Sequence, residues 1–382
     1  MKNKFLQFIT ATFTASIIWS NAHAIDSKAR NLILMDYTTG AYLYSKEITA
    51  PIPPASMSKL MTIYIIFDKL RDGSLSLDDT FKVSENAWRK GGAASGGSTM
   101  FLSIGDEVKI DELLKGIIIQ SGNDACIVAA ENIAGDEESF AKMMNNKAQE
   151  LGLKNSHFAN ATGLPHPDHK MSVEDLAILA KKLIKDFPQF YHLFSQKEFV
   201  YNNIRQGNRN PLLYSMPYAD GLKTGHTDEA GYCLTASAKR GDRRIIGVMT
   251  GLNSNKERSE EAEKMMSWAF REYDNYTLIK KRDKLADIPV WYGVDASVPL
   301  VVEEDIVRTI KKSHFNKAKI SVIYNKPVKA PIQMGQQLGI LKIEIPNHPT
   351  EEIPLLAGQT INKVGLGRKI ILNLKYLLSG SL

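Results

Sequence analysis

The stretch Pro53-Pro54-Ala55-Ser56-Met57-Ser58-Lys59 decides how the chain is interpreted, because it opens an apolar run with a serine and a lysine three positions apart. Residues i and i+3 share one face of a helix, so the Lys59 amine can reach the Ser56 hydroxyl. A lysine in that position can take the serine proton and make the serine a nucleophile without a histidine. The stretch therefore predicts a helix that begins near Ser56 and a site for acyl transfer.

Two further motifs follow this stretch in a fixed order. They are Ser121-Gly122-Asn123 and Lys223-Thr224-Gly225. The order Ser-x-x-Lys, Ser-x-Asn, Lys-Thr-Gly resembles that of the serine enzymes that recognise penicillin. Two other matches are discounted: Ser139-Phe140-Ala141-Lys142 is a chance match to the first motif, and Ser84-Glu85-Asn86 is interpreted as a helix cap.

The polar groups of the first two motifs have distinct predicted roles. We expect Lys59 to accept the Ser56 proton. A second buried cation favours the neutral form of a lysine, and Lys223 is the candidate for that cation. Ser121 is expected to relay a proton to the leaving amine, and Asn123 to orient the Lys59 amine and a substrate carbonyl.

The third motif is expected to bind substrate. Lys223 is predicted to stay charged and to hold an anionic group, while Thr224 donates a hydrogen bond to a carboxylate. Gly225 lets a substrate backbone approach a strand edge. The backbone amides of Ser56 and His226 are natural oxyanion donors. The His226 side chain has either a supporting or a purely structural role, since no acidic partner is visible in the sequence.

The pattern of apolar residues predicts the fold class of residues 25–283. A β-hairpin is expected over residues 31–44 and another over 232–250, with helices between them and a last helix over 257–273. This arrangement predicts an α+β domain with an antiparallel sheet flanked by helices. The Gly/Ser-rich stretch 91–98 is predicted to be a mobile loop, either a flap over a site or a plain connection.

The two ends of the chain and the region before the tail carry different signals. Residues 1–24 contain two lysines, a short apolar stretch and Ala22-His23-Ala24, which predict a signal peptide removed on export; an uncleaved anchor is the alternative. Residues 284–362 predict a small all-β domain. Residues 363–382 predict an amphipathic helix that associates with a membrane surface, with packing on the protein itself as the alternative.

Composition excludes several classes of partner. The net charge of +6 is spread along the chain without a basic run, so we expect no nucleic acid. No cluster has metal-ligand spacing, so no metal or other cofactor is expected. Cys126 and Cys233 lie in a helix-like and a strand-like stretch, and we expect two buried free thiols rather than a disulfide.

Over nearly its whole length the chain resembles low-molecular-mass penicillin-binding proteins of the D-alanyl-D-alanine carboxypeptidase type. The three motifs carry the resemblance, together with segments 160–165 and 171–176. It implies a penicillin-binding or β-lactamase-like catalytic domain that removes the terminal D-alanine of peptidoglycan stem pentapeptides through a Ser56 acyl-enzyme. It also implies covalent inhibition by β-lactams, a periplasmic location at the outer face of the cytoplasmic membrane, and no cofactor.

The resemblance also suggests a residue that binds the terminal carboxylate, namely Arg258; the alternative is a solvated charge paired with Glu261 or Glu257. Three other functions stay open at this point. They are a D,D-endopeptidase on crosslinked peptidoglycan, a class A-like β-lactamase with Glu174 as the deacylating base, and a wall-binding protein without turnover.

Overall fold

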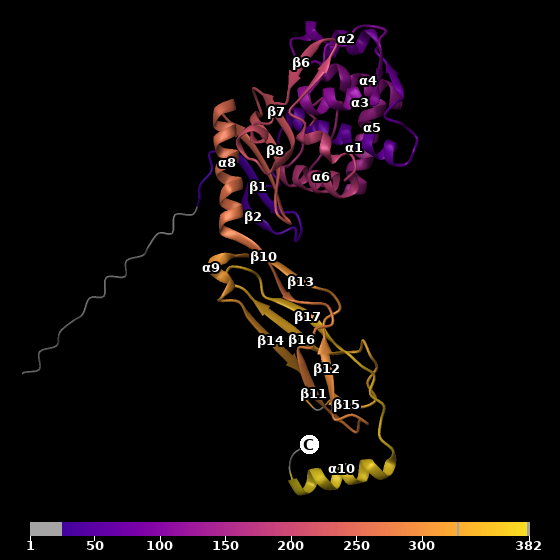
Figure 1. Cartoon of the computed structure of the whole chain (residues 1–382), viewed down its shortest axis with the longest axis vertical. Coiled ribbons are helices and arrows are strands. Elements are labelled where there is room, and N and C mark those ends of the chain that lie inside the picture. The colour runs from indigo at the N-terminus through magenta and orange to yellow at the C-terminus, as the bar shows by residue number, and fades with distance from the viewer. Residues whose placement is uncertain (1–24, 327, 380–382) are drawn as a thin grey trace, which may run out of the picture.

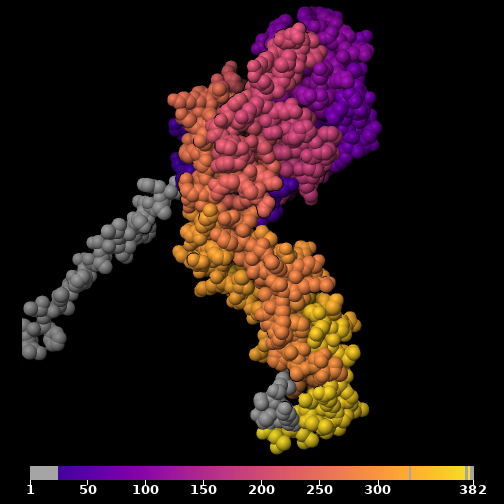
Figure 2. Space-filling view, viewed as in Figure 1, coloured from indigo at the N-terminus to yellow at the C-terminus, as the bar shows by residue number. Residues whose placement is uncertain are grey.

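A computed structural model describes residues 25–326 and 328–379 (Figure 1). The expected signal peptide, residues 1–24, lies outside the described residues. The chain forms a broad domain of helices and strands, then a narrower β-rich domain, and ends in helix α10 (Figures 1 and 2). The predicted fold class is therefore confirmed for both domains.

One antiparallel sheet forms the centre of the first domain, with strand order β2-β1-β9-β8-β7. Its strands are β1 (Asn31–Asp36), β2 (Tyr42–Lys46), β7 (Ala219–Thr227), β8 (Gly231–Arg240) and β9 (Arg243–Leu252). Strand β1 pairs with both β2 and β9, so the N-terminal hairpin joins the C-terminal strands in one sheet. Both expected hairpins are present.

The sheet is covered on both faces. Adjacent residues of β1 point to opposite sides, so Ile33 joins the larger core and Leu34 the smaller one. Helix α8 covers the smaller core, and the other long helices contribute to the larger core. These helices are α1 (Lys59–Arg71), α4 (Asn123–Ala134), α5 (Glu137–Leu151), α6 (Val173–Asp186) and α8 (Asn255–Glu272). Because β1 is buried on both faces, all six of its residues are buried.

Short elements complete the first domain. They are β3 (Thr80–Lys82), β4 (Glu107–Lys109), β5 (Glu198–Tyr201), β6 (Ile204–Gly207), α2 (Glu85–Gly91), α3 (Ile110–Lys115) and α7 (Leu212–Ser215). Ser84 caps α2 by accepting a hydrogen bond from the Ala87 amide, as expected. The prediction that residues 91–98 lack regular structure is wrong in part, since α2 ends at Gly91 and a 3-10 turn covers Ala93–Ser95.

The second domain is built from strands, apart from one short helix. Its elements are β10 (Tyr273–Ile279), β11 (Ala286–Trp291), β12 (Ser297–Val301), β13 (Ile306–Lys311), α9 (Lys312–Phe315), β14 (Lys319–Tyr324), β15 (Val328–Lys329), β16 (Gln337–Glu344) and β17 (Glu351–Ala357). Six strands form one sheet in the order β14-β16-β17-β12-β11-β15, and β10 pairs with β13. Strand β10 is therefore the first strand along the chain that pairs with a strand of the second domain.

A polar joint connects the two domains. The buried carboxylate of Asp36 lies 3.1 Å from Arg243 Nε and accepts a hydrogen bond from Asn275 Nδ2. The hydroxyls of Thr39 and Thr309 lie 2.5 Å apart. These contacts link Asp36 of β1 to strand β10, and Thr39 of the turn after β1 to strand β13.

Helix α10 (Leu366–Ser379) ends the described chain at the tip of the second domain (Figure 1). Its large exposed apolar side chains are Leu366, Ile370, Ile371, Leu374, Leu377 and Leu378. None of the helices within the described residues has both the length and the apolar character needed to cross a bilayer.

Both cysteines are buried and unpaired, which confirms the predicted free thiols.

Candidate active site

Ser56 lies in a tight turn rather than in the first turn of an α-helix. Residues Ala55–Ser58 form a 3-10 turn, and α1 begins at Lys59. The turn is packed closely from two sides by glycines. A Cβ on Gly163 would lie 2.1 Å from the Ala55 carbonyl oxygen, and one on Gly225 would lie 3.2 Å from the Ser56 amide nitrogen. A glycine at position 225 therefore allows β7 to approach this turn closely, a reason that the sequence does not reveal.

Lys59 brings the first two motifs together. Its Nζ lies 2.8 Å from Ser56 Oγ and 2.8 Å from Asn123 Oδ1. A third contact, 2.5 Å long, joins Nζ to the backbone carbonyl oxygen of Thr162, which lies 103 residues away in the chain. The expected contact between Lys59 and Ser56 is present even though the turn is 3-10, because residues i and i+3 also share a face there.

Burial increases the fraction of Lys59 that is neutral and able to accept a proton near neutral pH. The side chain has no exposed surface, and burial lowers its pKa to about 8. The sequence predicts Lys223 as the neighbouring cation that favours the neutral amine. In the structure the positive charge of Arg209 lowers the pKa of Lys59 further, and the repulsion between Lys59 and Lys223 lowers the pKa of Lys223.

Lys223 is also buried and lacks an anionic partner within the described residues. Its Nζ donates a hydrogen bond to the backbone carbonyl of Thr224, 3.1 Å away. Burial lowers the pKa of Lys223 well below its usual value, and the charges of Lys59 and Arg209 lower it further. A charged Lys223 is therefore disfavoured in the free site, and an incoming carboxylate would favour it.

Ser121 and Asn123 flank the start of α4. Ser121 follows a π-helical turn (Gly116–Gln120), has a positive φ of 66° and is buried. Its Oγ has no hydrogen-bond partner in the described part of the chain. A hydroxyl left free in a buried position is available to a substrate.

A cavity of about 240 Å³ lies beside Ser56. It is lined by Ser56, Ser98, Ser121, Arg209, Thr224, Gly225, His226, Tyr232 and Arg258. Six of these nine residues are predicted from the sequence, and Lys59 and Asn123 join them through the contacts with Lys59 Nζ. The structure therefore brings the three motifs to one cavity.

Arg209 and Ser98 are site residues that the sequence analysis misses. The Arg209 guanidinium donates to Ser98 Oγ, so the segment after β6 contacts the Gly/Ser-rich stretch. Burial lowers the pKa of Arg209. Neither residue belongs to a motif, and their proximity depends on how distant segments pack, so no local signal identifies them.

Arg258 lies on α8 and is buried. It donates hydrogen bonds to the Cys233 carbonyl and to Asn255 Oδ1. The alternative that Arg258 is a solvated charge paired with Glu257 or Glu261 is wrong, because these carboxylates form ion pairs with Lys28 and Lys264.

His226 is exposed at the end of β7, and its ring contacts that of Tyr232 with centroids 4.1 Å apart and planes tilted by 37°. No ion pair of His226 with a carboxylate occurs among the residues described. Glu174 lies at the start of α6 and accepts a hydrogen bond from the Tyr42 hydroxyl, 2.8 Å away. It does not line the cavity beside Ser56.

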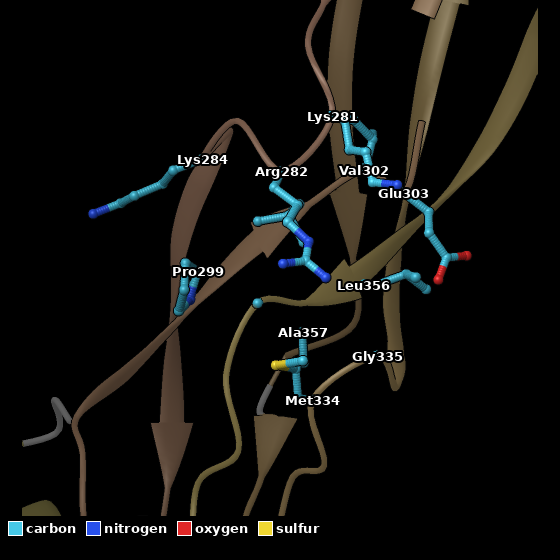
Figure 3. Close-up of a pocket in the computed structure, with 12 residues that line it drawn as sticks. Lys281, Arg282, Lys284, Pro299, Val302, Glu303, Met334, Gly335, Leu356 and Ala357 are labelled. Carbon is cyan, nitrogen blue, oxygen red and sulfur yellow. The ribbon is translucent and has the colours of Figure 1, made fainter. Parts of the chain in front are cut away.

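A larger cavity, of about 550 Å³, lies in the second domain (Figure 3). Lys281, Arg282 and Lys284 lie at one side of it, and Leu356 and Met334 at another (Figure 3). Its lining contains no serine, cysteine or threonine that would serve as a nucleophile. Size alone therefore does not identify the site of chemistry in this protein.

Comparison with known proteins agrees with this geometry. The D-alanyl-D-alanine carboxypeptidase family matches residues 19–254. The family described as penicillin-binding protein 5, C-terminal domain, matches residues 273–363. The two matches correspond to the two domains of the structure.

Individual relatives show the same similarity over most of their length. The D-alanyl-D-alanine carboxypeptidase DacC of Escherichia coli is 38% identical, over 94% of this chain and 90% of its own. The crystal structure of penicillin-binding protein 5 from Haemophilus influenzae superposes with a TM-score of 0.77 at 32% identity, over 89% of this chain and 99% of its own. The crystal structure of the D-alanyl-D-alanine carboxypeptidase DacD from Francisella tularensis superposes with a TM-score of 0.79 at 30% identity, over 89% of this chain and 95% of its own. The chain therefore belongs to the D-alanyl-D-alanine carboxypeptidase family of serine peptidases.

Proposed function

We propose that Ser56 is the acyl-enzyme nucleophile of a D-alanyl-D-alanine carboxypeptidase and that Lys59 is its general base. The observation that carries the proposal is the environment of Lys59 Nζ. A neutral amine has two N–H bonds and one lone pair. The acceptors Asn123 Oδ1 and Thr162 O take the two N–H bonds, so the lone pair is left for the Ser56 hydroxyl proton.

In acylation, Ser56 Oγ attacks the carbonyl carbon of the penultimate D-alanine while its proton passes to Lys59 Nζ. The backbone amides of Ser56 and His226 are the proposed donors to the oxyanion; a donor of this kind contributes about 3 to 4 kcal/mol in comparable sites. The Ser121 hydroxyl then passes its proton to the nitrogen of the leaving D-alanine as the peptide bond breaks, and it takes in return the proton that Lys59 Nζ accepted from Ser56, so that Lys59 is neutral again. Its free, buried Oγ supports this role.

The terminal carboxylate of the substrate is proposed to lie among Lys223, Thr224 and Arg258. A carboxylate there offsets the cost of burying these cations, since it favours their charged forms. Arg209 adds positive charge to the same cavity. In deacylation, water attacks the acyl carbon and Lys59 accepts its proton. Lys59 then passes this proton to Ser56 Oγ as the ester bond breaks, which restores the serine hydroxyl and the neutral amine.

Peptidoglycan stem peptides are the proposed substrates. β-Lactams are the proposed covalent inhibitors, because their strained amide presents a carbonyl to Ser56 and a separate carboxylate of the molecule can meet the same cations. We also propose that residues 1–24 are a signal peptide and that the mature protein is periplasmic. The exposed apolar residues of α10 support its attachment to the outer face of the cytoplasmic membrane. Pairing of β10 with β13 supports a domain limit at 272/273 instead of the expected 283/284.

The test is release of D-alanine from an acyl-Lys-D-Ala-D-Ala peptide by the mature protein and by its Ser56→Ala variant, with and without benzylpenicillin. Release that requires Ser56 and stops with benzylpenicillin is the expected result. If Ser56 is labelled by penicillin but no D-alanine is released, the carboxypeptidase proposal is overturned. Crosslinked muropeptides then test the endopeptidase alternative.

A further inference from the structure

We propose that Tyr232 is a positioning residue for Arg258 and thereby sets the affinity of the site for the terminal carboxylate. The inference rests on the proposed function, because it assigns that carboxylate to Arg258. Tyr232 lies on β8 and lines the same cavity as Ser56 and Arg258. It belongs to none of the three motifs.

The guanidinium of Arg258 has few contacts that hold it in place. Its carbon lies 5.6 Å from the centre of the Tyr232 ring, within the range of a cation–π interaction. Its two terminal nitrogens donate to the Cys233 carbonyl and to Asn255 Oδ1. Its Nε is buried and has no hydrogen-bond partner among the described residues.

No carboxylate in the described part of the chain forms an ion pair with Arg258. This distinguishes it from Arg244, a buried arginine of the same domain, which meets Asp220 at 2.7 Å. An arginine without a carboxylate depends on neutral contacts for its orientation. The Tyr232 ring is one of these neutral contacts, and the negative face of the ring attracts the guanidinium.

The contacts of Tyr232 with neighbouring strands hold this residue in place. Its backbone pairs with His226 on β7 and with Leu252 on β9, so the residue occupies a central strand. The His226 ring also contacts the Tyr232 ring, with the two planes tilted by 37°. Strand pairing and this ring contact therefore restrict the position of Tyr232, which supports Arg258.

The expected kinetic effect follows from when the carboxylate contact is made. Arg258 would bind the terminal carboxylate in the ground state and in the transition state alike, because that group does not react. Loss of such uniform binding raises KM and leaves kcat nearly unchanged. A direct contact between Tyr232 and the rest of the substrate would act on peptides with or without the carboxylate.

The test compares two substrates, the acyl-Lys-D-Ala-D-Ala peptide and the same peptide with a terminal amide, in wild type, Tyr232→Leu and Tyr232→Phe. Tyr232→Leu is expected to raise KM for the acid by about fivefold to tenfold, with kcat within about twofold, because the cation–π contact is lost. KM for the amide is expected not to change. Tyr232→Phe keeps the ring and is expected to resemble wild type.

Tyr44→Leu is the matched control, since Tyr44 packs against Trp268 of α8, away from Arg258, with centroids 6.2 Å apart. In an Arg258→Ala background, Tyr232→Leu is expected to have no further effect on KM.

Should Tyr232→Leu fail to fold, Tyr232→Met replaces it. Equal rises in KM for acid and amide, or an unchanged KM, overturn the proposal. Absence of D-alanine release by wild type would overturn the proposed function before any variant is compared.

Discussion

Two buried cations of the central sheet have neighbours of opposite charge: one lies beside a carboxylate and the other lies near further cations. Arg243, on β9 at the joint between the domains, lies 3.1 Å from the buried carboxylate of Asp36. Lys223, on β7 beside the cavity, has a carbonyl oxygen as its nearest acceptor and two further cations, Lys59 and Arg209, nearby. The joint pairs opposite charges, and the cavity gathers like charges.

The difference separates a structural role from a binding role. A buried charge with a hydrogen-bonded partner of opposite sign belongs to a satisfied network. A buried charge without such a partner costs free energy unless it loses its proton or gains an anion. We therefore propose that the cavity beside Ser56 binds an anionic ligand, while the Arg243 charge at the joint is already paired with Asp36, although Arg243 Nη2 has no hydrogen-bond partner among the described residues.

The largest expected effect comes from removing the base. Lys59→Met keeps the volume of the side chain but has no lone pair on nitrogen to accept the Ser56 proton. We expect the rate of acylation by benzylpenicillin to fall by about 10³-fold or more. The measurement is the rate of covalent labelling of Ser56, with circular dichroism to show that the variant is folded. Labelling at the wild-type rate would exclude Lys59 as the base.

A second pair of variants tests the comparison of the two cations directly. Arg243→Met leaves the Asp36 carboxylate buried without its cation, and we expect a loss of about 3 kcal/mol in the free energy of unfolding. Lys223→Met removes an unpaired buried cation, so the protein is expected to keep or gain stability. Urea unfolding measures both. A larger loss for Lys223→Met than for Arg243→Met would contradict the assignment of roles.

The pH dependence tests the state of Lys59. Its pKa is lowered to about 8, and only the neutral amine accepts a proton, so activity is lost as pH falls below this value. We expect kcat/KM to rise about tenfold per pH unit below pH 8 and to level off above it. Arg209→Met removes a nearby positive charge and is expected to move the profile to higher pH. A profile that is flat from pH 6 to 9 would contradict a lysine base.

The smallest effect is expected at Glu174, a carboxylate that is bonded to Tyr42 and does not line the cavity. Glu174→Gln is expected to change the rate of deacylation by less than about twofold, within the range of an ordinary surface substitution. Decay of the penicilloyl-enzyme, followed by mass spectrometry, measures this rate. A large accumulation of acyl-enzyme would instead support Glu174 as a deacylating base, as in the β-lactamase alternative.

Much of the fold follows from local signals. The hairpin strands β8 and β9, the capped helix α2 and the short strands of the second domain all appear where alternation and caps predict them. The stretch 91–98 does not, because Ala93–Ser95 form a 3-10 turn within a segment rich in glycine. Composition predicts flexibility there but carries no information on the contacts that order the segment.

The sequence by itself determined the proposed nucleophile and base, since Ser56 and Lys59 are only three positions apart and meet through local helical geometry. The order of the three motifs also identified the family. Tertiary structure alone decided the surroundings on which their proposed reactivity depends: the burial that lowers the Lys59 pKa, the Thr162 carbonyl that contacts its amine, and the position of Arg209. These features depend on contacts between residues far apart in the chain, and local patterns do not encode such contacts.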